Sequence, residues 1–87
     1  MNIERIETAT RKEKPDWNSD LGFGKIFTDY MFTMDWTAAD GWCNAKIEPY
    51  APICMDPASL VLHYAQETFE GLKAYKTKDG RVLLFRP

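Results

Sequence analysis

Over Ile26–Trp36 mostly apolar positions alternate with positions of mixed character, and this pattern places a strong limit on the fold. Every second position from Ile26 is apolar or aromatic with one exception, and the positions between them are mixed. This period of two is typical of a strand with one buried face. The strand is followed by an Asp-Gly turn within Thr37–Gly41 and by a candidate return strand, Trp42–Glu48. The pattern therefore predicts a β-hairpin.

The next stretch predicts a helix. Prolines at three nearby positions leave room for no more than a short edge strand around Ile53. Asp56 can cap a helix whose first position is Pro57, and Gly71 can close it in a left-handed conformation. Apolar residues recur between these limits at a spacing of three or four, which gives the helix one packing face; they are Val61, Tyr64, Ala65, Thr68 and Leu72.

A second hairpin is predicted from Leu72–Lys76 and Arg81–Arg86, with an Asp-Gly turn between them. Because the strands come as hairpins and not as βαβ crossovers, we expect an α+β fold. It would be a two-layer sandwich, a largely antiparallel sheet with one main helix packed on it. Residues 1–20 show no sustained period and are expected to form a flexible N-terminal lead-in, leaving residues 21–87 as the folded part.

Composition narrows the function classes. With 87 residues the chain has room for one domain with a small core. Its net charge of −2 and its scattered basic residues predict no nucleic-acid partner. Two cysteines, Cys43 and Cys54, and the single His63 cannot supply a four-ligand zinc site. We find no apolar run long enough for a membrane span and no leader pattern, so we expect a cytoplasmic protein without a membrane partner.

The side chains assemble no recognisable catalytic set. One histidine and dispersed serines give no nucleophile with its base and orienting group, and we predict no catalytic, cofactor-binding or metal-binding residue. His63 is better explained as a hydrogen-bonded structural residue than as a catalyst. Three aromatic residues, Phe23, Tyr64 and Phe69, lie beside glycines or near the predicted helix. On their own, such residues are more often part of a core than of a site.

Four short motifs favour a functional role for these aromatic residues. Leu62-His63-Tyr64 is followed by Phe69-Glu70-Gly71 and then by Phe85-Arg86-Pro87, and LGFGKIFTDYMF precedes them at residues 21–32. In type and order these motifs resemble the N-terminal part of the small domain of the branched-chain amino-acid aminotransferases, which are pyridoxal-phosphate enzymes of fold type IV. The resemblance implies a homodimeric transferase of amino-acid biosynthesis that passes the amino group of leucine, isoleucine or valine to 2-oxoglutarate.

The resemblance also implies roles for single residues. Positions matching Phe23, Tyr64 and Phe69 line the pocket for the apolar substrate side chain, and the tyrosine reaches the site of the neighbouring subunit. In this family pyridoxal 5'-phosphate is bound mainly by a later part of the polypeptide, which carries the Schiff-base lysine. We therefore expect the isolated 87-residue segment to be inactive and to expose apolar surface that the rest of the enzyme would cover.

Two other hypotheses on the function of the chain stay open. D-amino-acid aminotransferases and aminodeoxychorismate lyases share the fold, although the spacing from Tyr64 to Phe69 and the opening LGFGKIFTDYM favour the branched-chain enzymes. A non-enzymatic binding module that uses its exposed aromatic residues as a partner surface is the alternative of a different class. Such a module would present one bounded apolar patch.

Overall fold

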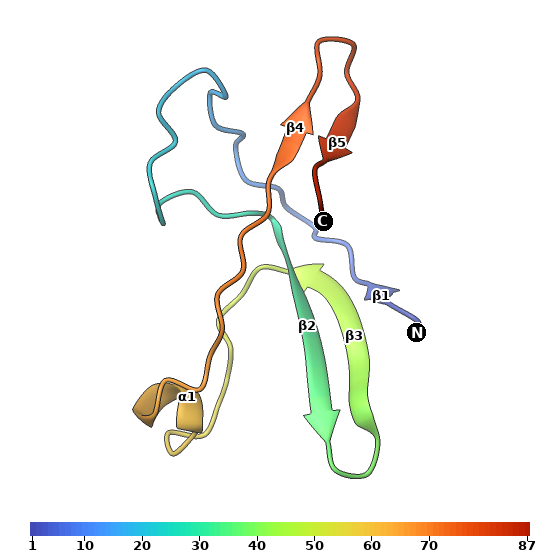
Figure 1. Cartoon of the computed structure of the whole chain (residues 1–87), viewed down its shortest axis with the longest axis vertical. Helices are drawn as coiled ribbons and strands as arrows, with labels where there is room; N and C mark the ends of the chain where they lie inside the picture. The colour runs from blue at the N-terminus through green and yellow to red at the C-terminus, as the bar shows by residue number, and fades with distance from the viewer. The chain divides into compact units, whose positions relative to one another are not determined.

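The computed structural model describes residues Met1–Pro87 and divides into two compact units, Met1–Ile53 and Cys54–Pro87. Figure 1 shows that strands dominate and helix is scarce. In chain order the elements are β1 (Glu4–Arg5), β2 (Tyr30–Thr37), β3 (Gly41–Pro49), α1 (Leu60–His63), β4 (Ala74–Lys76) and β5 (Val82–Leu84). The first unit holds β1 to β3, and the second holds the remaining three elements.

The first predicted hairpin is confirmed. β2 and β3 pair antiparallel, with Trp36 opposite Trp42 and Thr37 opposite Gly41 at the turn. Gly41 has a φ of 66°, a left-handed conformation that glycine adopts without steric cost. The strand starts at Tyr30, four residues later than the alternation indicated, because the preceding residues belong to a loop with two left-handed glycines.

A β-bulge interrupts this hairpin. The register shifts between Thr33 and Asp35, so three steps along β3 match two steps along β2. Asn44 lies at the bulge with a φ of 54°, and its Nδ2 donates a hydrogen bond to Asp35 Oδ2 at 3.1 Å. Asparagine tolerates this conformation better than most residues. The neighbouring Ala45 is 4% exposed and is the buried apolar residue of the chain.

A short strand near the N-terminus, which no pattern in the sequence indicated, completes the sheet. β1 pairs parallel with β3, with Glu4 opposite Lys46 and Arg5 opposite Ile47, which sets the order β1-β3-β2. The pairing continues one residue further, because the Ile6 N–H donates to the Ile47 carbonyl at 2.9 Å. β1 thus covers one edge of β3, while the larger strand pair remains antiparallel as predicted.

The helix is much shorter than the sequence pattern indicated. It spans Leu60–His63, and Ser59, not Asp56, stands at its N-cap without a side-chain hydrogen bond. Tyr64 ends it, and Ala65 follows with a φ of 48°, so Gly71 does not close it. Helices of this length depend on tertiary packing of their apolar face, and α1 has no buried residue. No strand forms around Ile53, where the prolines left room for at most a short edge strand.

The second predicted hairpin is confirmed in shortened form. β4 and β5 pair antiparallel, with Lys76 opposite Val82, in a sheet of their own. Thr77 closes the turn, because the Arg81 N–H donates to its Oγ1 at 3.0 Å and its own N–H donates to the Arg81 carbonyl at 2.8 Å. Gly80 has a φ of 89°, the left-handed conformation expected of glycine in a turn.

Little of the chain is buried. Its accessible surface is 8589 Å², against about 5,300 Å² for a folded monomer of 10.1 kDa. Large apolar side chains are exposed in both units, including Phe32, Trp36 and Trp42 in the first hairpin. No helix combines the length and apolar character needed to cross a bilayer. Exposed apolar surface of this extent agrees with the expectation from the sequence.

Candidate functional site

The three aromatic residues singled out from the sequence are all exposed. Phe23 lies in the first unit, and Tyr64 and Phe69 lie in the second. Their exposed fractions are 90%, 80% and 86%, so none of them belongs to a core within its own unit. Their side chains are therefore free to contact a substrate, another part of a longer polypeptide or a second subunit.

Phe23 lies between two glycines at a turn of the backbone. Gly22 and Gly24 both adopt left-handed conformations, with φ of 68° and 70°. The Gly22 N–H donates to Asp20 Oδ1 at 3.0 Å, an Asx-type turn just before the aromatic residue. The flanking glycines allow a sharp turn of the backbone at Phe23, and the side chain itself contributes no buried packing.

Tyr64 and Phe69 follow the short helix. The Tyr64 N–H donates to the Leu60 carbonyl at 2.7 Å, which ties the tyrosine to the last turn of α1. His63 Nε2 lies 2.6 Å from the Pro57 carbonyl oxygen. A carbonyl only accepts, so this contact requires a proton on Nε2 and uses His63 to brace the loop that enters the helix. Phe69 lies in a segment without regular structure.

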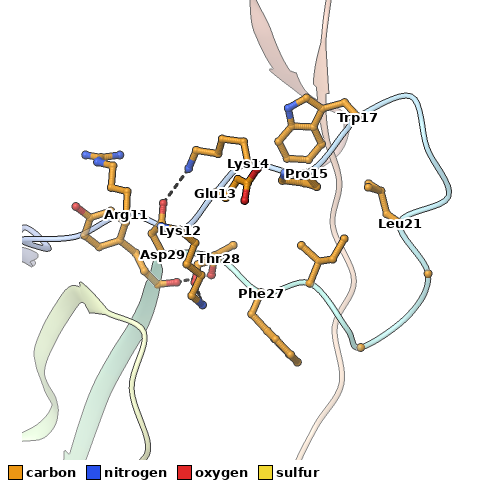
Figure 2. A pocket seen from close by; sticks show the side chains of 14 residues that line it. Arg11, Lys12, Glu13, Lys14, Pro15, Trp17, Leu21, Phe27, Thr28 and Asp29 are labelled. Carbon is orange, nitrogen blue, oxygen red and sulfur yellow. Dashed lines mark hydrogen bonds and ion pairs between the residues drawn. The ribbon is translucent and has the colours of Figure 1, made fainter.

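An open hollow of about 730 Å³, which the sequence analysis did not predict, lies in the first unit (Figure 2). Its lining combines basic and apolar side chains from residues 11–30; they are Arg11, Lys12, Glu13, Lys14, Pro15, Trp17, Leu21, Gly22, Gly24, Ile26, Phe27, Thr28, Asp29 and Tyr30. Trp17 and Leu21 lie on one side of it, and Arg11 and Lys12 on the other. Phe23 is absent from this lining, although both flanking glycines contribute to it.

Asp29 is the best-connected side chain at this hollow. Its Oδ2 pairs with Lys14 Nζ at 2.8 Å, and its Oδ1 accepts the Lys12 N–H at 2.8 Å. Its backbone carbonyl accepts the Tyr50 N–H at 2.9 Å. The side chain is 7% exposed, whereas that of Lys14 is 62% exposed. The hydrogen bond from Lys14, followed by the one from the Lys12 backbone, lowers the pKa of the Asp29 carboxyl below its ordinary value of 3.8.

The other cations around the hollow are also engaged. Lys12 Nζ donates to the Thr28 carbonyl at 2.9 Å and lies 4.3 Å from the centre of the Tyr50 ring. The Arg11 guanidinium lies 5.7 Å from the centre of the Tyr30 ring, and it is 3.9 Å from Glu7 Oε2. Because these groups already have partners within the chain, the hollow does not fit a phosphate group that needs free cations and amide donors.

Comparison with known proteins shows the family of the chain. No protein-family model matches it. Branched-chain-amino-acid transaminase 1 of Bacillus subtilis is 62% identical over 85 residues, which are 98% of this chain and 24% of that protein. The chain belongs to the branched-chain-amino-acid aminotransferase family. Branched-chain-amino-acid aminotransferase 2 of the same organism is 57% identical over 84 residues, and the cytosolic enzyme of Saccharomyces cerevisiae is 49% identical over 83.

The chain spans about a quarter of the length of the aminotransferases it matches. A probable branched-chain-amino-acid aminotransferase of Staphylococcus aureus matches at 62% identity over 87 residues, 100% of this chain. The region of likeness therefore includes Phe23, Tyr64 and Phe69. The remaining three quarters of such an aminotransferase have no counterpart in these 87 residues.

Proposed function

We propose that this chain supplies the N-terminal part of the small domain of a branched-chain aminotransferase, an enzyme that transfers the amino group of leucine, isoleucine or valine to 2-oxoglutarate. The observation that carries the proposal is the 62% identity to a branched-chain-amino-acid transaminase over 98% of the chain. Identity at this level over the whole segment is difficult to reconcile with a self-contained binding module, as is apolar exposure spread over both units.

In this proposal Phe23, Tyr64 and Phe69 form apolar walls for the substrate side chain. Burying a methylene group contributes about 0.8 kcal/mol, so large aromatic surfaces favour leucine over smaller amino acids. The Tyr64 hydroxyl adds one polar group to an otherwise apolar pocket. High exposure of all three side chains supports this role, because burial in a core would have removed them from any substrate.

Pyridoxal 5'-phosphate is the cofactor that the family resemblance implies. When bound, it serves as the electron sink of transamination. The engaged cations of the first unit do not suit its phosphate, so we assign its binding to later parts of the longer polypeptide and derive no step of it here. Residues of this chain would shape the pocket, orient the substrate side chain and exclude water. The isolated chain would then lack transaminase activity.

The surrounding assembly is part of the same proposal. The exposed apolar faces of both units would be covered by the rest of the polypeptide and by a second subunit in a homodimer. The helix that spans Leu60–His63 would then gain a packing surface, lengthen and complete a two-layer sandwich on the sheet. We expect the full-length enzyme to act in amino-acid biosynthesis in the cytoplasm, as the family resemblance implies.

Transaminase assays test the proposal directly. The full-length gene product, supplied with pyridoxal phosphate, should convert L-leucine and 2-oxoglutarate, and the 87-residue chain alone should not. Tyr64→Ala should lower kcat/KM for leucine, whereas Tyr75→Ala in β4, which removes another exposed tyrosine, should not. Activity with D-alanine in place of L-leucine would point to a D-amino-acid aminotransferase. No aminotransferase activity with either substrate would refute the proposal.

A further inference from the structure

We infer that Asp29 is a positioning residue for the proposed substrate pocket, because it clamps the base of the loop that carries Phe23. The loop comprises residues 15–28 and is called the 15–28 loop below. The inference rests on the proposed function, since it concerns the placement of a proposed pocket wall. It assigns Asp29 no contact with substrate.

Contacts at both ends of the 15–28 loop converge on this one side chain. Lys12 and Lys14 precede the loop, and Asp29 directly follows it. The Asp29 carboxylate accepts a hydrogen bond from the Lys12 backbone N–H and one from the Lys14 ammonium, at 2.8 Å each. The Lys12 ammonium adds a bond across the same base, to the Thr28 carbonyl at 2.9 Å. Charge-assisted bonds of this length are the stronger class of hydrogen bond.

The base is itself anchored to the sheet. The Asp29 carbonyl accepts the Tyr50 N–H at 2.9 Å, one position beyond the Tyr30–Pro49 pair of the ladder. The ring of Phe27, inside the loop, stacks on Tyr50 with centroids 5.5 Å apart. The carboxylate therefore lies where the sheet, the N-terminal segment and the 15–28 loop meet.

Phe23 depends on this clamp because it has little other support. It is 90% exposed and does not line the hollow. The hydrogen bonds within the loop that involve side chains are local, over two or three residues, at Asp16 and Asp20. A loop tied mainly at its base samples more positions when that tie is cut. Loss of the Asp29 charge should therefore displace Phe23 without removing it.

Limited trypsin digestion of the chain tests the clamp itself. Lys25 lies in the 15–28 loop, and Lys78 lies in the β4–β5 turn as an internal reference. Asp29→Asn keeps the shape but removes the charge, and it should raise cleavage after Lys25 relative to Lys78 by roughly fivefold, since cleavage follows local opening. Asp79→Asn, the same substitution at a carboxylate paired with Arg81 at 3.0 Å, should leave the absolute rate after Lys25 unchanged. An unchanged ratio in Asp29→Asn overturns the clamp.

A double-mutant cycle in the full-length enzyme tests the positioning. Asp29→Asn should lower kcat/KM for L-leucine relative to L-alanine by about tenfold, the scale of discrimination by one apolar contact. In a Phe23→Ala background the same substitution should cause no further loss of selectivity. Equal loss for both substrates would mean a purely structural role, and additive losses would mean a role independent of Phe23. Each result overturns the inference.

The digestion and the enzyme assays distinguish failure of the clamp from failure of the proposed function. If the full-length enzyme shows no transaminase activity, the proposed function fails and this inference fails with it, whatever the digestion shows. If the enzyme is active but the digestion ratio does not change, the proposed function stands and only the inference is lost.

Discussion

Lys14 and Asp29 form an ion pair, 2.8 Å between Nζ and Oδ2, that joins two segments fifteen residues apart. The two side chains differ in exposure, because that of the aspartate is 7% exposed and that of the lysine is 62% exposed. Most exposed ion pairs contribute little. Here the carboxylate also accepts the Lys12 backbone N–H, so its loss would leave two donors without a partner.

The amide of Lys12 should report the ionisation of Asp29. Since the pKa of this carboxyl is lowered in the folded chain, the bond to Lys12 is fully present above 3.8 and is lost as the pH falls through the folded pKa. The Lys12 amide proton shift, followed by NMR from pH 6 downward, should therefore titrate with a midpoint below 3.8. A midpoint at or above 3.8 would contradict the clamp. The titration should disappear in Asp29→Asn, which is the control.

The β-bulge at Asn44 predicts an ordering of substitutions. Both Asn44→Gly and Asn44→Ala lose the hydrogen bond to Asp35, but glycine adopts a φ of 54° without strain. Asn44→Ala should therefore lower the free energy of unfolding by about 1 kcal/mol more than Asn44→Gly does, since alanine keeps a Cβ in the left-handed region. Urea denaturation of both variants measures this. Equal stability of the two would show that the left-handed conformation carries no cost.

Local sequence patterns predicted the hairpins because their signals lie within a few residues. Alternation and an Asp-Gly turn were enough to predict both hairpins, while the residue pairs, Trp36 with Trp42 and Lys76 with Val82, come from the structure. The helix was overestimated because its periodic face, Val61 to Leu72, requires a partner surface for stability. In this chain that face stays unburied, and the helix keeps one turn.

The features that the sequence did not predict depend on contacts between distant residues. β1 is two residues long and has no periodicity, and only its pairing with β3 reveals it. The Lys14–Asp29 contact has no spacing signature, since the loop between the two residues is irregular. In contrast, Phe23, Tyr64 and Phe69 were found through motif resemblance, and their joint role in one pocket stays a prediction.

Removal of the N-terminal strand should expose the edge of β3. Deletion of residues 1–7 eliminates the pairs Glu4–Lys46 and Arg5–Ile47 and the bond from Ile6 to Ile47. An uncovered strand edge is a template for pairing with another chain, so the truncated chain should self-associate at lower concentrations. Analytical ultracentrifugation of both forms measures the difference. A truncated chain that stays as monomeric as the parent would show that β1 does not protect this edge.

The two glycines beside proposed pocket walls should differ in their tolerance of a side chain. Gly24 has a φ of 70°, and Gly71 is not in the left-handed region, while neither has an atom within 4 Å of an added Cβ. Gly24→Ala should therefore lower the free energy of unfolding of this chain by about 1 kcal/mol through backbone strain alone. Gly71→Ala is the matched control and should be nearly neutral. The reverse order in a urea titration would contradict the loop geometry.

If this chain builds part of the substrate pocket of a branched-chain aminotransferase, as we propose, its substrate selectivity is the quantity to measure. The quantity is kcat/KM for L-leucine against L-alanine, with 2-oxoglutarate as acceptor, in the full-length enzyme and in Phe69→Ala. We expect the parent to favour leucine and the variant to lose about tenfold of that preference. A parent without transaminase activity, or a variant with unchanged preference, would show that Phe69 does not form such a pocket.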